Sequence, residues 1–129
     1  MTAAIDPAGN TTSRSILIVD DDEGFREALG AQLRLVGYGV RLAPDYRLAL
    51  EILESDETVD LLLLDIVMPD RVNGLALGRM ARLRRREIKI IYISGYDVTG
   101  LDREALGPII RKPVNNDELL EEIRRLLAS

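Results

Sequence analysis

The sequence predicts an α/β protein built on a doubly wound parallel sheet, and two observations carry this prediction. Short apolar runs alternate with segments of helical periodicity, strand then helix, five times along the 129 residues. One of these runs, residues 61–64, is four consecutive leucines. Only a strand that is covered on both faces can bury such a run, which is typical of a parallel sheet. Right-handed crossovers then place helices on both faces of the sheet.

Each expected strand is an apolar run that ends at a polar or turn-forming residue. The central run stops at the charge of Asp65, and Pro69 then interrupts the strand pattern. The next run along the chain ends at Ser94 and Gly95. The five strands are expected at Ser15–Asp20, Tyr38–Leu42, Asp60–Asp65, Ile88–Ile93 and Leu106–Arg111.

A helix is expected after each strand. In the first helix, apolar residues recur at helical spacing from Phe25 to Val36, and Gly37 is suited to end it. The other four helices are expected to open at Pro44, to carry Leu75–Leu83 behind an Asn73 cap, to cover residues 97–105, and to run from Asn115 to Leu127 with a capping box at its start.

The composition fits one globular domain, expected in the cytoplasm. Residues 1–14 are small and polar and are expected to form a flexible tail, and residues 15–129 one compact domain. No apolar run is long enough to span a membrane, and the N-terminus lacks the pattern of a signal peptide. The absence of cysteine excludes disulfides and thiolate metal sites. The net charge of −5 argues against a nucleic-acid-binding surface.

Functional side chains follow four of the five expected strands. Asp20 and Asp21 follow the first strand, Asp65 the third, Ser94 the fourth and Lys112 the fifth. Because the carboxyl ends of parallel strands meet at one edge of the sheet, these side chains are expected to converge there. Each residue alone is a weak signal, since acids after a strand can simply cap the next helix and a lone lysine is usually a surface residue. Their convergence is the stronger indication.

This set of residues points to phosphoryl transfer onto an aspartate. Three neighbouring carboxylates repel one another, and a divalent cation removes that repulsion. The sequence has no histidine and no cysteine, so the ligands would be oxygens, which select Mg²⁺ or, as a second choice, Mn²⁺. A carboxylate beside such an ion can attack phosphorus and form an acyl phosphate. Lys112 and Ser94 would supply the donors that the new charge needs.

At these residues the sequence resembles the receiver domain of two-component response regulators. The resemblance rests on Ile-Leu-Ile-Val-Asp-Asp-Asp at 16–22, Leu-Leu-Leu-Leu-Asp-Ile-Val-Met-Pro at 61–69, Ile-Ser-Gly at 93–95 and Arg-Lys-Pro at 111–113. It extends over about Ser15 to Ser129. It implies a flavodoxin-like fold whose five strands have the order 2-1-3-4-5.

The resemblance also implies a role for each residue. Asp65 would be the phosphoacceptor, Ser94 would hydrogen-bond the phosphoryl group, and Lys112 would pair with that group. The peptide bond between Lys112 and Pro113 would be cis. A histidine kinase or a histidine phosphotransfer protein would supply the phosphoryl group, and the output would be a change in partner binding. The domain would catalyse only its own phosphorylation and dephosphorylation.

The implied metal site uses the acids and one backbone group. Asp21 would bind Mg²⁺ directly, Asp20 mainly through water, and the backbone carbonyl of Val67 would complete the protein ligands alongside Asp65. One position departs from the family: an aromatic residue often stands three residues before the lysine, where this chain has Ile109. The longer loop after the central strand resembles receivers attached to hybrid histidine kinases. A single-domain regulator and a receiver from a larger protein both stay open.

Three other functions compete with the receiver. A Mg²⁺-dependent phosphohydrolase of the aspartyl-phosphate type would place a second acid two residues after its nucleophile, where this chain has Val67. A docking module that works without phosphorylation would have no need of the acid cluster. A flavin binder shares the fold, but the acidic loop at Asp20–Asp22 would repel the flavin phosphate.

Overall fold

The five expected strands form one parallel sheet. The computed structural model describes residues 14–66, 74–95 and 107–128. All strand pairings in these ranges are parallel, and the sheet order is β2-β1-β3-β4-β5, as the family resemblance implied. The strands are β1 (Ser15–Val19), β2 (Gly39–Ala43), β3 (Leu61–Asp65), β4 (Lys89–Ser94) and β5 (Ile109–Arg111).

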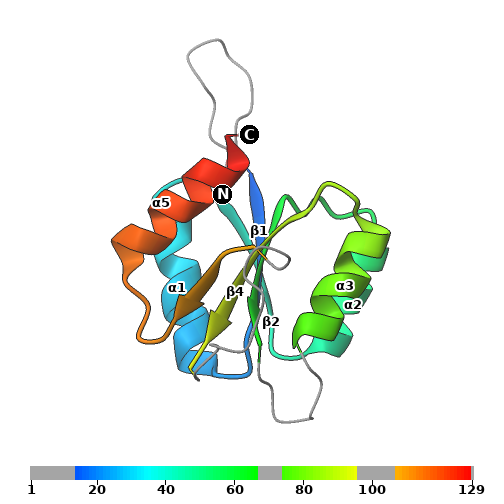
Figure 1. Ribbon diagram of the computed structural model, residues 1–129, viewed down its shortest axis with the longest axis horizontal. Helices are drawn as coiled ribbons and strands as arrows, with labels where there is room; N and C mark the ends of the chain where they lie inside the picture. The colour runs from blue at the N-terminus through cyan, green and yellow to red at the C-terminus, as the bar shows by residue number, and fades with distance from the viewer. Residues whose placement is uncertain (1–13, 67–73, 96–106, 129) are drawn as a thin grey trace.

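Helices cover both faces of the sheet, so the predicted doubly wound α/β class is confirmed. Figure 1 shows α1 and α5 on one face and α2 and α3 on the other. The strands run downward in that view, so their carboxyl ends meet at the lower edge. The described helices are α1 (Glu23–Leu35), α2 (Tyr46–Glu54), α3 (Gly74–Arg84) and α5 (Asn116–Leu127).

The four leucines of β3 explain why the sheet lies between two helix layers. Leu62 and Leu64 pack into the core beneath α2 and α3, and Leu61 and Leu63 pack into the core beneath α1 and α5. All four side chains are fully buried. Because successive residues of a strand face opposite sides, a leucine run of this kind is stable only with helices on both faces.

Three helices begin at side-chain caps that the sequence supplies. Asp22, Asp45 and Asn115 each accept a hydrogen bond from a backbone N–H in the first turn of α1, α2 and α5 respectively. The cap at Asn115 was expected. Helix α2 begins at Tyr46 and not at Pro44 as predicted, because the carboxylate of Asp45 provides the capping oxygen.

Other element ends differ from the expected positions by a residue or two. Ser94 is the last residue of β4 instead of the first residue after it, and β5 is shorter than expected because it pairs only with β4. The peptide bond between Lys112 and Pro113 is cis, as predicted. The expected cap at Asn73 and the short helix at 97–105 lie outside the described residues.

Helix α3 starts in direct contact with the end of the central strand. The N–H of Gly74 donates to the carbonyl of Ile66 at 2.7 Å. A Cβ atom at Gly74 would lie 2.2 Å from the carbonyl oxygen of Asp65, so only glycine fits at this point. The close approach fixes the backbone of Asp65 against α3.

Among the described residues, no helix is long and apolar enough to cross a membrane.

Candidate functional site

The carboxyl ends of four neighbouring strands bring the predicted site residues to one edge of the sheet. Asp20 follows β1, Asp65 ends β3, Ser94 ends β4 and Lys112 follows β5. The strand register places Asp65 opposite Ile93 and Ser94 opposite Arg111. The N–H of Lys112 donates to the carbonyl of Ser94 at 2.8 Å, which ties the fifth strand end to the fourth. The parallel topology alone therefore creates the cluster.

Three carboxylates lie close together at this edge. One oxygen each from Asp20, Asp21 and Asp65 falls within 4.8 Å of the others. Asp20 and Asp65 are only 1% and 6% exposed, whereas Asp21 is exposed to solvent. Like charges at this spacing repel, and burial weakens the screening by water. The cluster therefore needs positive charge nearby.

Lys112 provides part of that charge. Its Nζ donates a hydrogen bond to Oδ2 of Asp20 at 2.9 Å and lies 3.7 Å from Oδ2 of Asp65. Burial lowers the pKa of Lys112, but the hydrogen bond to Asp20 and the charges of Asp20, Asp65 and Asp22 outweigh burial and raise the pKa above its ordinary value. The side chain is therefore an ammonium at neutral pH, held between two carboxylates.

The three consecutive aspartates have separate tasks. Asp22 caps α1, because its Oδ1 accepts from the N–H of Phe25 at 3.1 Å. Asp20 instead uses Oδ1 to accept from the N–H of Asp22 at 2.9 Å and Oδ2 to accept from Lys112. The helix-capping explanation of this acidic run therefore applies to Asp22, whereas Asp20 and Asp21 face the site.

The donor set of the acid cluster fits a hard divalent cation. Its three ligand candidates are carboxylate oxygens, which bind Mg²⁺ and Mn²⁺ well. Asp20 and Asp65 are held in place by the ends of their strands, and the exposed Asp21 leaves the cluster open to solvent on one side. The fourth predicted ligand, the backbone carbonyl of Val67, lies outside the described residues.

Ser94 and Ile109 are buried or half-buried at the same end of the sheet. Ser94 is fully buried at the end of β4. Ile109 pairs with Tyr92 across the ladder and packs against the core beneath α2 and α3. An aliphatic residue therefore fills the position at which the resemblance noted in the sequence would place an aromatic ring.

Two residues of α1 contact the site, and no pattern in the sequence predicts either contact. The ring of Phe25 faces the ammonium of Lys112, with Nζ 4.4 Å from the ring centroid. The guanidinium of Arg26 donates to the backbone carbonyl of Asp20 at 2.9 Å. Both residues stand in the first turn of α1, where helical periodicity predicted only a core position for Phe25. Their contacts depend on how α1 packs, which spacing does not encode.

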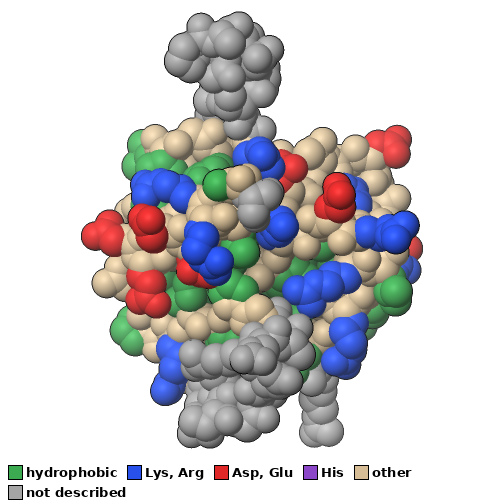
Figure 2. Space-filling view, turned by 45° about the horizontal axis from the view of Figure 1, so that its top comes forward, with side chains coloured by type: hydrophobic (Ala, Val, Ile, Leu, Met, Phe, Trp, Pro, Cys, Tyr) green, Lys and Arg blue, Asp and Glu red, His purple; other side chains and the backbone are tan. Residues whose placement is uncertain are grey.

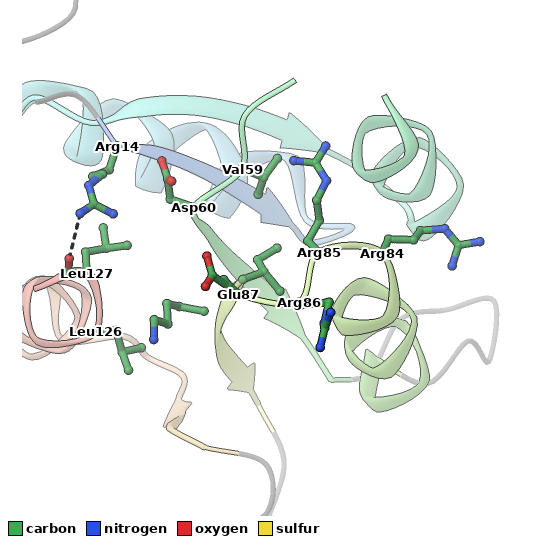
Figure 3. A pocket seen from close by; sticks show the side chains of 11 residues that line it. Arg14, Val59, Asp60, Arg84, Arg85, Arg86, Glu87, Leu126 and Leu127 are labelled. Atoms are coloured by element: carbon green, nitrogen blue, oxygen red, sulfur yellow. Dashed lines mark hydrogen bonds between the residues drawn. The ribbon is translucent and has the colours of Figure 1, made fainter. Parts of the chain in front are cut away.

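A wide hollow at the other end of the sheet contains none of the predicted site residues. It has a volume of about 1100 Å³ and is lined by the starts of β3 and β4 and by the ends of α3 and α5. Figure 3 shows its arginines, including Arg14 and Arg85, together with Asp60. The hollow is therefore separate from the predicted site, whose residues lie at the opposite edge of the sheet.

Comparisons with known proteins agree with this geometry. The family model of the response regulator receiver domain matches residues 16–124. The response regulator MprA of Mycolicibacterium vanbaalenii is 39% identical over 117 residues, which is 87% of this chain and 49% of that protein. The chain thus spans about half the length of this curated relative.

Two solved structures share the fold over most of the chain. A CheY-like receiver domain protein from Methanospirillum hungatei superposes with a TM-score of 0.83 at 33% identity, covering 91% of this chain and 95% of that one. The response regulator TrrA of Thermotoga maritima, in complex with Mg²⁺-BeF, superposes with a TM-score of 0.77 at 32% identity, covering 88% and 98%. With the match to the family model, these relatives show that the chain belongs to the response regulator receiver domain family.

Proposed function

We propose that this receiver accepts a phosphoryl group on Asp65 from the phosphohistidine of a histidine kinase or a histidine phosphotransfer protein. One observation carries the proposal: the carboxylate of Asp65 stands at the end of a buried strand, within 4.8 Å of two other carboxylates and 3.7 Å from the Lys112 ammonium. The sequence contains no histidine, so the donor histidine lies outside these 129 residues. Phosphorylation would then change the binding of a partner protein.

The transfer step exchanges one bond to phosphorus for another. A carboxylate oxygen of Asp65 attacks phosphorus, and the bond from phosphorus to the donor imidazole breaks, leaving its electron pair on the nitrogen. The product is an acyl phosphate on Asp65. The ammonium of Lys112 lies close enough to offset charge on the phosphoryl oxygens, and the hydroxyl of Ser94 is a further donor at the end of the neighbouring strand.

A divalent cation, Mg²⁺ in the first place and Mn²⁺ in the second, fits beside Asp65. When bound, it supplies the positive charge that three crowded carboxylates and an incoming phosphoryl group require. Asp20, Asp21 and Asp65 would hold it, with the carbonyl of Val67 as a further ligand. The structure of TrrA with Mg²⁺-BeF supports this assignment, because that receiver is 32% identical to this chain.

The test is an intact-mass assay with acetyl phosphate as the donor. The protein should gain one phosphoryl group in the presence of Mg²⁺ and none when the metal is chelated. Asp65→Asn should abolish the gain, whereas Asp56→Asn, which changes an exposed acid far from the cluster, should leave it intact. Labelling that survives in Asp65→Asn would show that the nucleophile is another residue. No labelling of the wild type would favour a docking module that works without phosphorylation.

A further inference from the structure

The ring of Phe25 contacts the lysine of the proposed phosphorylation site. The ammonium nitrogen of Lys112 lies 4.4 Å from the ring centroid, within the range at which a cation is attracted to an aromatic face. Phe25 is the only phenylalanine in the sequence, and it stands in the first turn of α1. The contact joins the helix after the acidic loop to the residue after β5.

The position of this ring is fixed from two sides. The N–H of Phe25 is bonded to the carboxylate of Asp22, so the ring belongs to the capped start of α1. The half-buried side chain also packs against the core between the sheet and α1 and α5. The cap and the packing both hold the ring at the start of α1, on the side that faces Lys112.

Lys112 is less constrained by its own chain. Its backbone is held by the bond to the carbonyl of Ser94, but four rotatable bonds separate that backbone from the ammonium. The side chain is 27% exposed and lies along an apolar groove of about 310 Å³ that Phe25, Pro113 and Val114 help to line. The hydrogen bond to Asp20, the ion pair with Asp65 at 3.7 Å and the contact with the ring together locate the ammonium.

We propose that Phe25 is a positioning residue for phosphoryl acceptance, a role that rests on the function proposed above. Its ring keeps the ammonium of Lys112 at the acid cluster, so that the positive charge is in place when the phosphoryl group arrives. Without the ring, the lysine spends more time in rotamers that point into solvent. The rate of Asp65 phosphorylation then falls, even though Lys112, Ser94 and the carboxylates are unchanged.

The experiment compares three substitutions of Phe25 in the full chain. Phe25→Leu removes the aromatic face and retains an apolar side chain, whereas Phe25→Tyr and Phe25→Trp retain the face. The rate of labelling by acetyl phosphate at saturating Mg²⁺ should fall about two- to fivefold in Phe25→Leu and should stay near the wild-type rate in the two aromatic variants. Tyr38→Leu is the matched control, because Tyr38 is another half-buried aromatic residue on the same core and lies beyond the opposite end of α1 from Phe25.

A second readout follows the lysine without metal or phosphodonor. Protons held over an aromatic face resonate upfield, so the ε-methylene signals of Lys112 should be shifted upfield in the wild type and in Phe25→Tyr. They should move to the ordinary lysine position in Phe25→Leu. A melting curve of each variant separates this effect from a general loss of structure.

The outcomes distinguish the two proposals. If the wild type is labelled and Phe25→Leu is labelled equally fast, the positioning role is overturned and the receiver function stands. The same holds if the wild type is labelled and Phe25→Tyr is as slow as Phe25→Leu. Unshifted Lys112 signals in the wild type also overturn the role. A wild type that is never labelled rejects the receiver function, and the role of Phe25 falls with it.

Discussion

The two ends of the sheet carry similar charged residues and use them in opposite ways. At the amino end, around the hollow of Figure 3, Arg14, Asp60 and Arg85 bond to backbone groups. Arg84, on the same rim, forms a solvent-exposed ion pair with Glu54. At the carboxyl end, Lys112 contacts other side chains, the carboxylates of Asp20 and Asp65. Figure 2 looks toward the amino end and shows lysine and arginine side chains across the middle and right of that surface.

The contacts at the amino end are structural. Asp60 accepts from the N–H of Ser15 at 2.7 Å, and Arg14 donates to the carbonyl of Leu127 at 3.2 Å. Arg85 donates to three carbonyl oxygens at the end of α2, those of Ile52, Leu53 and Ser55. A charge that satisfies backbone groups stabilises the fold and has little capacity left for a ligand.

The carboxyl end keeps its charges unbalanced. Of the three clustered carboxylates, two are buried, and the ammonium of Lys112 lies 2.9 Å from Asp20 and 3.7 Å from Asp65, the two buried ones. Such an arrangement costs stability and leaves a demand for further positive charge. The comparison teaches that the partner of a charged side chain, more than its residue type, separates a structural charge from a reactive one.

The largest change in the free energy of unfolding is expected for Arg85→Ala at the amino end. Loss of its bonds to the end of α2 leaves three carbonyl oxygens without this donor and should lower the free energy of unfolding by about 2 kcal/mol, measured by urea titration. The rate of Asp65 phosphorylation should not change. Arg86→Ala, at an exposed neighbouring arginine, should cost less than about 0.5 kcal/mol. Equal costs for the two variants would contradict a structural role for Arg85.

A smaller change in stability, of the opposite sign, is expected for Asp21→Asn at the carboxyl end. The substitution removes one charge from the cluster, so the metal-free protein should be as stable as the wild type or more stable. The affinity for Mg²⁺ should fall about tenfold or more, since even partners one step removed from a metal matter by that much. Calorimetric titration with Mg²⁺ measures the affinity, with Asp56→Asn as the control. An unchanged affinity would remove Asp21 from the metal site.

The smallest change in stability is expected for Tyr92→Phe, at a buried hydroxyl that lies in neither charged cluster. The hydroxyl of Tyr92 has no hydrogen-bond partner of ordinary geometry among the described residues, and it lies over Gly78, where a Cβ atom would come within 2.1 Å of it. Tyr92→Phe removes this hydroxyl and should leave the free energy of unfolding unchanged or raise it by up to about 1 kcal/mol. A clear loss of stability would reveal a partner for the hydroxyl.

The same variant makes a prediction about alkaline pH. Burial raises the pKa of Tyr92, while the positive charges of Arg82 and Arg79 oppose the rise. A raised pKa means that the folded state holds the proton more tightly, so this contribution is complete below the ordinary tyrosine pKa of about 10 and is lost as the pH rises through the raised value. Urea midpoints should therefore decline less steeply above about pH 10 in Tyr92→Phe than in the wild type.

The topology and most of the site were predictable because they depend on local pattern. Four consecutive leucines require a strand that is covered on both faces. Because the strands are parallel, Asp20, Asp65 and Lys112 lie at the same edge of the sheet, whatever the details of side-chain packing. The acidic run was harder to divide, because spacing cannot say which aspartate caps the helix. The structure assigns that task to Asp22.

What the sequence did not predict are contacts that depend on the orientation of long side chains. The bonds of Arg85 cross from the end of α3 to the end of α2, and the ring of Phe25 meets Lys112 across the sheet edge. Periodicity assigns each of these residues to a face of its helix and gives no distance to another element. The limits of β5 were also uncertain, since an edge strand ends where its single neighbour stops pairing.

The close approach of Gly74 to the central strand has a consequence for how mutational data on this protein are understood. A library that replaces every residue in turn would find position 74 intolerant of all side chains, because the first added carbon would overlap the carbonyl oxygen of Asp65. Its intolerance would match that of the reacting groups, although it holds no proton, charge or ligand. A ranking of positions by tolerance alone would therefore group Gly74 with the residues that take part in the reaction. The short distance between position 74 and the carbonyl oxygen of Asp65 identifies it as a packing position instead.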